Sequence, residues 1–181
     1  SAFRAANGGL PGRAIVATQY SNLGLVQALR AIGCQVIMAN AGDKYVLQEM
    51  RRRGLALGGE QSGHIIMLEK TTTGDGLITA IEVAAIVAAT GKPLSELASV
   101  MVKFPQILVN VRVSRKDEYG ASAAIREAVE EAQAELGDAA RLVVRPSGTE
   151  PVVRVMGEGP DQAVVRKVVE GVAGVIRAEL A

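Results

Sequence analysis

The fold is decided by residues 14–39, which read AIVATQYSNLGLVQALRAIGCQVIMA. The stretch begins with a β-branched run, residues 14–18, that is typical of a short buried strand. Asn22 is a suitable N-cap for a helix with apolar residues on one face, and Gly33 ends that helix. Residues 35–39 then form a second apolar strand. A strand, a helix and a strand at this spacing indicate a βαβ unit with parallel strands.

The same pattern continues through the first half of the chain. Asp43 is expected to cap a second helix, and two further strand pieces, residues 55–57 and 65–68, flank a glycine-rich loop. Asp75 precedes a long apolar helix. We therefore predict an α/β fold in which residues 1–101 form an incomplete βαβ domain with a parallel sheet.

The pattern of apolar and polar residues changes near residues 101–104, where we place a domain boundary. Residues 107–113 alternate between apolar and polar side chains, which predicts a half-buried strand. Two amphipathic helices and two more strands follow, and the strands flank a compact loop at residues 145–151. Residues 105–181 are therefore predicted to form a small α+β domain with a mainly antiparallel sheet.

Composition excludes several classes of function. The 181 residues carry 20 Lys and Arg against 19 Asp and Glu, a formal net charge of +1. Binding to nucleic acid or to an anionic membrane normally needs an excess of positive charge, so we expect neither partner. Hydrophobic residues make up 49% of the chain and aromatic residues only 3%, so the core must be aliphatic.

Targeting and redox features favour a cytoplasmic location. The longest apolar run, residues 77–89, carries Glu82 and is too short to span a bilayer. The first residues show no signal-peptide pattern. The single cysteine, Cys34, cannot form an internal disulfide, and it cannot form a zinc site with the lone His64. We therefore expect a reducing compartment and no metal site in this chain.

The loop at residues 145–151, RPSGTEP, contains groups that bind an oxyanion. Arg145 can donate two parallel hydrogen bonds to a phosphate. Ser147 and Thr149 add hydroxyl donors. Gly148 allows successive backbone N–H groups to converge on an anion.

Two alternatives stay open for this loop. The same residue types form an ordinary hairpin turn, and residue types alone give phosphate binding and a turn even weight. Arg154, on the outgoing strand, could add charge to the site, pair with Glu150 or face solvent.

A second candidate loop, residues 58–64, reads GGEQSGH and suits a sugar. Glu60 can accept two hydrogen bonds from a vicinal diol, and Ser62 can both donate and accept. His64 is the only side chain here whose ordinary pKa lies near neutrality. The alternative is a glycine-rich strand connection in which His64 is a structural, hydrogen-bonded residue.

A third candidate segment is residues 41–45. Asp43 can be a plain helix cap, but Lys44 would place a cation beside the free N–H groups of a helix N-terminus, where anions bind. Lys44 is therefore a weaker candidate for contact with a phosphate.

At these loops the chain resembles the alpha-D-phosphohexomutases. Residues 59–64 look like the family's sugar-recognition loop, and residues 145–151 look like its phosphate-binding loop. Residues 42–46, 71–76 and 104–106 are similar to the bacterial phosphoglucosamine mutase branch. These motifs occur in the family's order and intervals, and the resemblance extends over nearly the whole chain.

The resemblance implies a C-terminal fragment. The family has four domains, and this chain is similar to most of the third and to all of the fourth. The motifs of the transferable phosphoserine and of the magnesium site belong to domains that this chain lacks. The resemblance therefore implies magnesium in the full-length enzyme, but no cofactor, no metal and no catalytic residue in this fragment, which we expect to be inactive alone.

The implied reaction interconverts glucosamine 6-phosphate and glucosamine 1-phosphate. The implied sugar-binding residues are Glu60, Ser62 and His64, of which His64 could assist as an acid or base. The implied phosphate-binding residues are Arg145, Ser147, Gly148 and Thr149, with Lys44 and Arg154 as weaker members. The expected partner is thus a small phosphosugar.

Two other hypotheses stay open at this point. One is a fragment of a phosphomannomutase/phosphoglucomutase. The other is a stand-alone module for phosphosugar binding or subunit association, in which exposed aliphatic faces would allow a homodimer.

Overall fold

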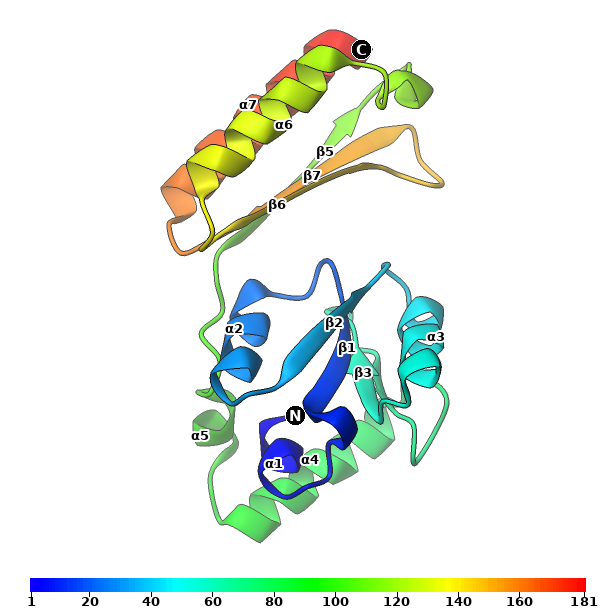
Figure 1. The fold of residues 1–181 in the computed structure, drawn as a ribbon, viewed down its shortest axis with the longest axis vertical. Helices are drawn as coiled ribbons and strands as arrows, with labels where there is room; N and C mark the ends of the chain where they lie inside the picture. The colour runs from blue at the N-terminus through cyan, green and yellow to red at the C-terminus, as the bar shows by residue number, and fades with distance from the viewer. The chain divides into compact units, whose positions relative to one another are not determined.

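The computed structural model describes residues 1–181, which form two compact units, Ser1–Lys103 and Phe104–Ala181 (Figure 1). Each unit contains one sheet, and each is described by itself below. No helix in either unit combines the length and the apolar character needed to cross a membrane.

The sheet of the first unit has the strand order β2-β1-β3-β4. Its strands are β1 (Ala14–Thr18), β2 (Gln35–Ala39), β3 (Leu57–Gly59) and β4 (Ile65–Met67). β1 pairs in parallel with both β2 and β3, which confirms the predicted βαβ arrangement. β4 differs from the expected all-parallel sheet because it pairs antiparallel with β3. The connection at residues 60–64 is too short for the crossover that a parallel pair needs.

The helices of the first unit are α1 (Ala2–Ala6), the 3-10 helix η1 (Pro11–Arg13), α2 (Leu23–Ala31), α3 (Asp43–Arg53), α4 (Gly76–Thr90) and α5 (Leu94–Ala98). The sequence predicts the helices that follow Asn22, Asp43 and Asp75, and these begin within one residue of the expected positions. The side chain of Asn22 accepts a hydrogen bond from the Gly24 N–H and caps α2. Asp75 caps α4 in the same way through the Ile78 N–H.

The expected cap of α3 is wrong by one residue. Gly42 precedes the helix, with φ 123°, and Asp43 is the first helical residue. The Asp43 Oδ1 atom accepts a hydrogen bond from its neighbour, the Lys44 N–H, at 2.7 Å. An acidic residue in the first turn still stabilises the helix dipole, so the aspartate remains favourable there.

The central strand β1 is buried along its whole length. Its residues alternate between two apolar clusters, with Ile15 in one and Val16 in the other. The first cluster includes Leu29 of α2 and the free thiol of Cys34, and the second includes Met50 of α3. A strand covered on both faces needs a continuous apolar run rather than an alternating one, which is what residues 14–18 provide.

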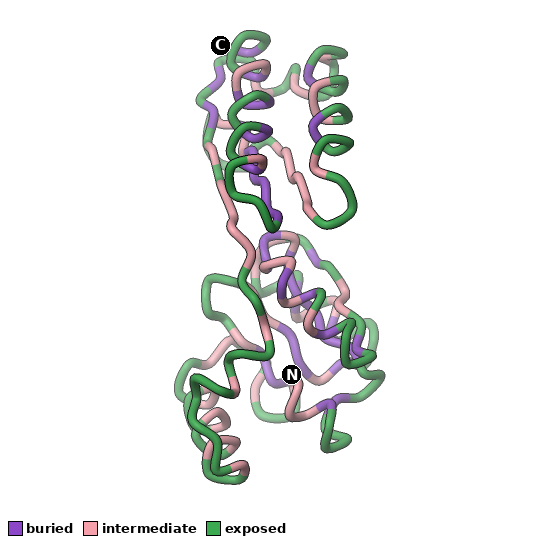
Figure 2. Tube along the Cα trace, turned by 90° about the vertical axis from the view of Figure 1, so that its left-hand side faces the viewer, coloured by how far each residue is buried: buried purple, intermediate pink, exposed green.

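The long helix α4 has no buried residue. Most of its residues are apolar, and Leu77 and Ile81 are largely exposed. No residue between positions 68 and 110 is buried, and Figure 2 shows where exposed and buried stretches lie along the chain. One face of α4 is therefore apolar and uncovered within this chain.

The second unit has an antiparallel sheet with the order β5-β7-β6. Its elements are β5 (Gln106–Arg112), the 3-10 helix η2 (Lys116–Glu118), α6 (Ala123–Leu136), β6 (Arg141–Pro146), β7 (Val152–Glu158) and α7 (Gln162–Leu180). The two long helices pack side by side and share one aliphatic core with the sheet (Figure 1). Val111 of β5 is buried in that core and its neighbours Asn110 and Arg112 are exposed, as the predicted alternation requires.

Candidate functional site

The connection between β3 and β4 is a tight loop that gathers three predicted sugar-binding side chains. The Glu60 N–H donates to the His64 carbonyl at 3.0 Å, and the Gly63 N–H donates to the Glu60 carbonyl at 3.1 Å. This closure brings the side chains together: the Ser62 hydroxyl donates to Glu60 Oε1 at 2.7 Å and lies 2.9 Å from His64 Nδ1. The carboxylate, hydroxyl and imidazole groups therefore form one polar cluster.

The hydrogen bonds of this cluster define the histidine tautomer. His64 Nδ1 also lies 3.1 Å from Glu60 Oε1, an acceptor. Because the Ser62 hydrogen is directed to Glu60, we assign the hydrogen between Ser62 and His64 to Nδ1. In the neutral ring, Nε2 is then a hydrogen-bond acceptor. The His64 side chain is 52% exposed, so a ligand can reach it.

The second oxygen of Glu60 binds the start of α3. Glu60 Oε2 accepts from the Gly42 N–H at 3.2 Å, and the carboxylate side chain is only 15% exposed. This bond joins the loop at residues 60–64 to the segment at residues 42–45. The carboxylate is thus held at both oxygens, which fixes the direction in which it can accept from a ligand.

Lys44 lies on the element that Glu60 contacts, but its ammonium group has a different partner in this structure. The Lys44 Nζ atom lies 4.8 Å from the centre of the Tyr45 ring, a cation–π arrangement. The structure therefore brings the segment, but not the ammonium group itself, into contact with the cluster.

Gly74 brings a third segment, residues 71–76, against the same cluster. A Cβ atom at Gly74 would lie 2.8 Å from His64 Cβ and 3.0 Å from His64 Cα, closer than real side chains approach. Residue types indicate only a loop and a helix start here, and the family motif at residues 71–76 does not specify what Gly74 contacts. Three separate segments of the first unit thus meet around His64.

The loop at residues 145–151 connects β6 and β7 as a closed turn. The Ser147 N–H donates to the Val152 carbonyl at 2.9 Å, and the Ser147 hydroxyl accepts from the Glu150 N–H at 3.3 Å. Ser147 is only 5% exposed, whereas Gly148 and Thr149 form the exposed tip. The Ser147 side chain therefore closes the turn, a role that residue type alone did not indicate.

A row of polar side chains crosses the sheet beside this loop. Arg145 of β6 lies opposite Arg154 of β7, which in turn lies opposite Asn110 of β5. Register partners point to the same face, so the two arginines and the asparagine share the face away from α6 and α7. Arg154 pairs with Glu150 at 2.6 Å, and its Nε atom is buried without a partner.

Two residues that the sequence analysis did not single out hold the loop and its strand. The Lys116 ammonium donates to the carbonyls of Ser147, at 2.9 Å, and Glu150, at 3.3 Å. The Tyr119 hydroxyl donates to the Val144 carbonyl of β6 at 3.3 Å, and burial raises the pKa of Tyr119. Neither contact leaves a local signal, because both join positions far apart in the sequence.

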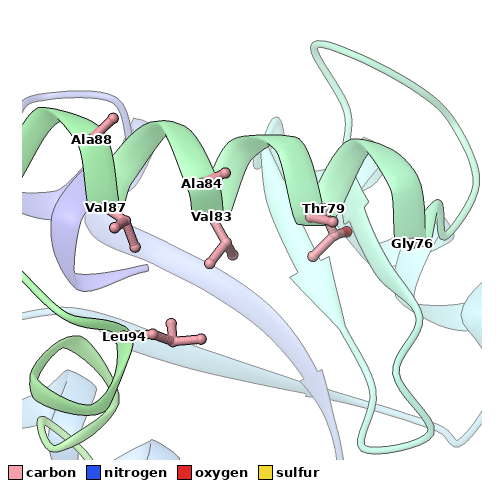
Figure 3. A pocket seen from close by; sticks show the side chains of 8 residues that line it. Gly76, Thr79, Val83, Ala84, Val87, Ala88 and Leu94 are labelled. Atoms are coloured by element: carbon pink, nitrogen blue, oxygen red, sulfur yellow. The ribbon is translucent and has the colours of Figure 1, made fainter.

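The apolar groove along α4 has a different chemistry from these loops (Figure 3). Its lining residues are Gly76, Thr79, Ala80, Val83, Ala84, Val87, Ala88 and Leu94. Thr79 carries its only polar side chain, and that hydroxyl donates to the Asp75 carbonyl. The groove therefore lacks the charged groups that a phosphosugar needs.

The acidic side chains do not form a metal centre. No group of three or more His, Cys, Asp or Glu residues is placed to hold a metal ion. Glu60 is occupied by Ser62 and by the Gly42 N–H instead.

Comparisons with known proteins agree with this architecture. Residues 1–104 match the family described as phosphoglucomutase/phosphomannomutase, alpha/beta/alpha domain III, and residues 108–175 match the C-terminal domain of the same family. The phosphoglucosamine mutase of Moorella thermoacetica is 54% identical over 169 residues, which are 93% of this chain and 38% of that protein. That of Rubrobacter xylanophilus is 52% identical over 175 residues, 95% of this chain and 39% of that protein.

Solved structures show the same fold at lower sequence identity. An N-acetylphosphoglucosamine mutase of Aspergillus fumigatus has a TM-score of 0.80 at 20% identity and covers 97% of this chain and 40% of its own. Another structure of that fungal enzyme, in complex with GlcNAc-6P and magnesium, has a TM-score of 0.77 at 19% identity, over 94% of this chain and 42% of its own. The chain spans about two fifths of the length of the curated relatives. It belongs to the phosphoglucomutase/phosphomannomutase family, of which it carries domain III and the C-terminal domain.

Proposed function

We propose that the two units are the substrate-recognition half of a phosphoglucosamine mutase, which interconverts glucosamine 6-phosphate and glucosamine 1-phosphate. The observation that carries this proposal is the contrast between the two loops. One is a cluster of a carboxylate, a hydroxyl and an imidazole, and the other is a turn beside two opposed arginines. A phosphosugar needs both kinds of contact. The high identity to two proteins named phosphoglucosamine mutase supports the choice of sugar.

The proposed role of the first loop is to hold ring hydroxyls. Glu60 accepts hydrogen bonds from neighbouring hydroxyls, and its bond to the Gly42 N–H keeps the carboxylate in one orientation. Ser62 donates or accepts, and His64 Nε2 adds an acceptor. Ring hydroxyls present similar groups in both orientations of the sugar, so one such loop can serve both isomers.

The proposed role of the second loop is to hold the phosphate that is not being transferred. Arg145 donates two parallel hydrogen bonds, and the exposed Gly148 and Thr149 add N–H and hydroxyl donors. Arg154 contributes charge, while Ser147 acts mainly by closing the turn. Binding energy from this remote phosphate orients the sugar for chemistry at its other end.

The phosphoryl transfer itself is assigned to other parts of the full-length protein. Magnesium, when bound there, would neutralise charge on the transferring group. The carboxylates of this chain form no metal cluster, so we give them no part in that step. We also propose a cytoplasmic location, because the one cysteine is a free thiol and the substrates are small soluble metabolites.

The isolated chain provides the first test. We expect no mutase turnover from it with glucosamine 6-phosphate and a hexose bisphosphate activator, while the full-length protein is active under the same conditions. Calorimetric titration with glucosamine 1-phosphate should give a Kd of about 1 mM or weaker, because much of the site's preorganisation is lost. Robust turnover, or micromolar binding, would contradict the proposal.

The choice of sugar is tested on the full-length protein. Its kcat/KM should be highest for glucosamine 6-phosphate, compared with mannose 6-phosphate and glucose 6-phosphate measured in parallel. A higher kcat/KM for either neutral sugar would assign the chain to a phosphomannomutase/phosphoglucomutase instead.

A further inference from the structure

Lys116 contacts the 145–151 loop although it lies 31 residues before Ser147 in the chain. It begins the 3-10 helix η2, and its Nζ atom donates to the carbonyls of Ser147, at 2.9 Å, and Glu150, at 3.3 Å. These two carbonyls lie at the two ends of the Gly148–Thr149 tip. One ammonium group therefore holds both ends of the turn.

Two of the backbone N–H groups in this turn are hydrogen-bonded within the chain, and two are not. The Ser147 N–H donates to Val152, and the Glu150 N–H donates to the Ser147 hydroxyl. The N–H groups of Gly148 and Thr149 have no partner within the chain. A concave group of backbone N–H donors binds an anion when the neighbouring carbonyls point elsewhere.

The contacts of Lys116 explain how the carbonyls of this turn can point away from a bound anion. A carbonyl oxygen carries partial negative charge, so it would repel a phosphate if it faced the ligand. The ammonium group binds the Ser147 and Glu150 carbonyls, which fixes them toward Lys116. Lys116 also forms no ion pair with a carboxylate, so its positive charge is not neutralised within the chain.

We propose that Lys116 is a positioning residue of the phosphate-binding loop. Its ammonium group holds the Ser147 and Glu150 carbonyls away from the ligand, keeps the Gly148 and Thr149 N–H groups available and adds a positive charge behind them. This inference rests on the proposed function of the loop.

The chemistry of lysine suits this position better than that of arginine. An ammonium group is a compact point charge that can donate to two carbonyls from a single nitrogen, whereas a guanidinium is a wide planar fork. Lys116→Met removes the charge and the donors at similar length. Lys116→Arg keeps the charge but changes the geometry, so the two variants separate the two contributions.

The test is a titration of the 181-residue chain with inorganic phosphate, followed by the amide NMR signals of Gly148 and Thr149. We expect phosphate to shift these two signals in the unmodified chain. Lys116→Met should weaken the phosphate Kd by about tenfold or more, the size of a lost charge-assisted hydrogen bond. Lys116→Arg should recover part of that loss. Lys167→Met, which removes an exposed lysine paired with Glu135, is the matched control and should change the Kd by less than about twofold.

The outcomes separate this inference from the proposed function. If the unmodified chain binds phosphate through Gly148 and Thr149 but Lys116→Met binds it equally well, the role of Lys116 is wrong and the loop's function stands. If phosphate does not move these two signals at all, the phosphate-binding function fails and the role of Lys116 fails with it. Recovery by Lys116→Arg but not by Lys116→Gln would show that the positive charge contributes beyond the hydrogen bonds to the two carbonyls. Should Lys116→Met not fold, Lys116→Gln replaces it, because its amide donates hydrogen bonds without a charge.

Discussion

Arg145 and Arg154 lie directly opposite each other on the antiparallel strands β6 and β7. Like charges in opposed positions destabilise a sheet by up to about 1 kcal/mol. Glu150 contacts Arg154 at 2.6 Å. A phosphate bound beside the two arginines would offset the repulsion between them.

Arg145→Ala should weaken phosphate recognition in the full-length enzyme by about 1.5–3 kcal/mol, the range for hydrogen bonds to a charged group. The expected result is a fall in kcat/KM of roughly tenfold or more. Arg166→Ala is the control, because Arg166 is an exposed arginine that pairs with Glu170 on α7. An unchanged kcat/KM for Arg145→Ala would show that Arg145 does not bind the phosphate.

Glu60→Gln should lower kcat/KM of the full-length enzyme by about tenfold or more, because a neutral amide accepts more weakly than a carboxylate. The amide oxygen can still accept from the Gly42 N–H, so we expect the unfolding midpoint to change little. Glu49→Gln tests whether any carboxylate loss on this unit has the same effect, since Glu49 is a partly exposed residue paired with Arg52 and Arg53. Equal losses in both variants would argue against a sugar contact at Glu60.

Gly74→Ala should reduce the free energy of unfolding by about 1–3 kcal/mol, the usual cost of overpacking. The added methyl group would lie 2.8 Å from His64 Cβ, so the histidine must move. Gly76→Ala is the matched control, because a Cβ there meets open space. Urea unfolding of both variants checks the prediction, and equal stabilities would show that the contact between Gly74 and His64 is loose.

Tyr119 should make the second unit less stable at alkaline pH. Burial raises its pKa above the ordinary value of 10.0, so the folded state holds the phenol proton more tightly than the unfolded state does. Stability is then constant below pH 10 and falls as the pH rises from 10 toward the higher folded pKa. Tyr119→Phe should be slightly less stable at pH 9, because it loses the bond to Val144, but should lose less stability between pH 9 and pH 11.

Urea unfolding at the two pH values measures this difference, and Tyr45→Phe serves as the control. Tyr45 is partly exposed at 37%, so its removal should leave the alkaline slope unchanged. The same slope in Tyr119→Phe and in the unmodified chain would exclude Tyr119 as its cause.

Local signals predicted where several helices begin. Asn22 and Asp75 each cap a helix through a side-chain oxygen, as their positions before apolar periods indicated. The error at Asp43 arose because its neighbour Gly42 adopts a left-handed φ, which residue type does not specify. The direction of β4 depended on the length of one connection rather than on its own residues.

The site was predictable only where its residues are close in sequence. Glu60, Ser62 and His64 lie on one short loop, so a local motif was enough to group them. The contacts of Gly74 with His64 and of Lys116 with Ser147 depend on how distant segments pack. Such tertiary contacts produce no periodicity or spacing in the sequence, so the sequence alone cannot predict them.

The buried thiol of Cys34 can report how often the first unit opens. This thiol is the only one in the chain and is 2% exposed, in the cluster that contains Ile15 and Leu29. A thiol reagent can modify it only when that cluster opens, and the second unit contributes no competing thiol. The rate of labelling at Cys34 therefore reports the opening of the first unit alone, while circular dichroism reports the loss of secondary structure in both units. Comparing the two signals during denaturation would separate the melting of domain III from that of the C-terminal domain.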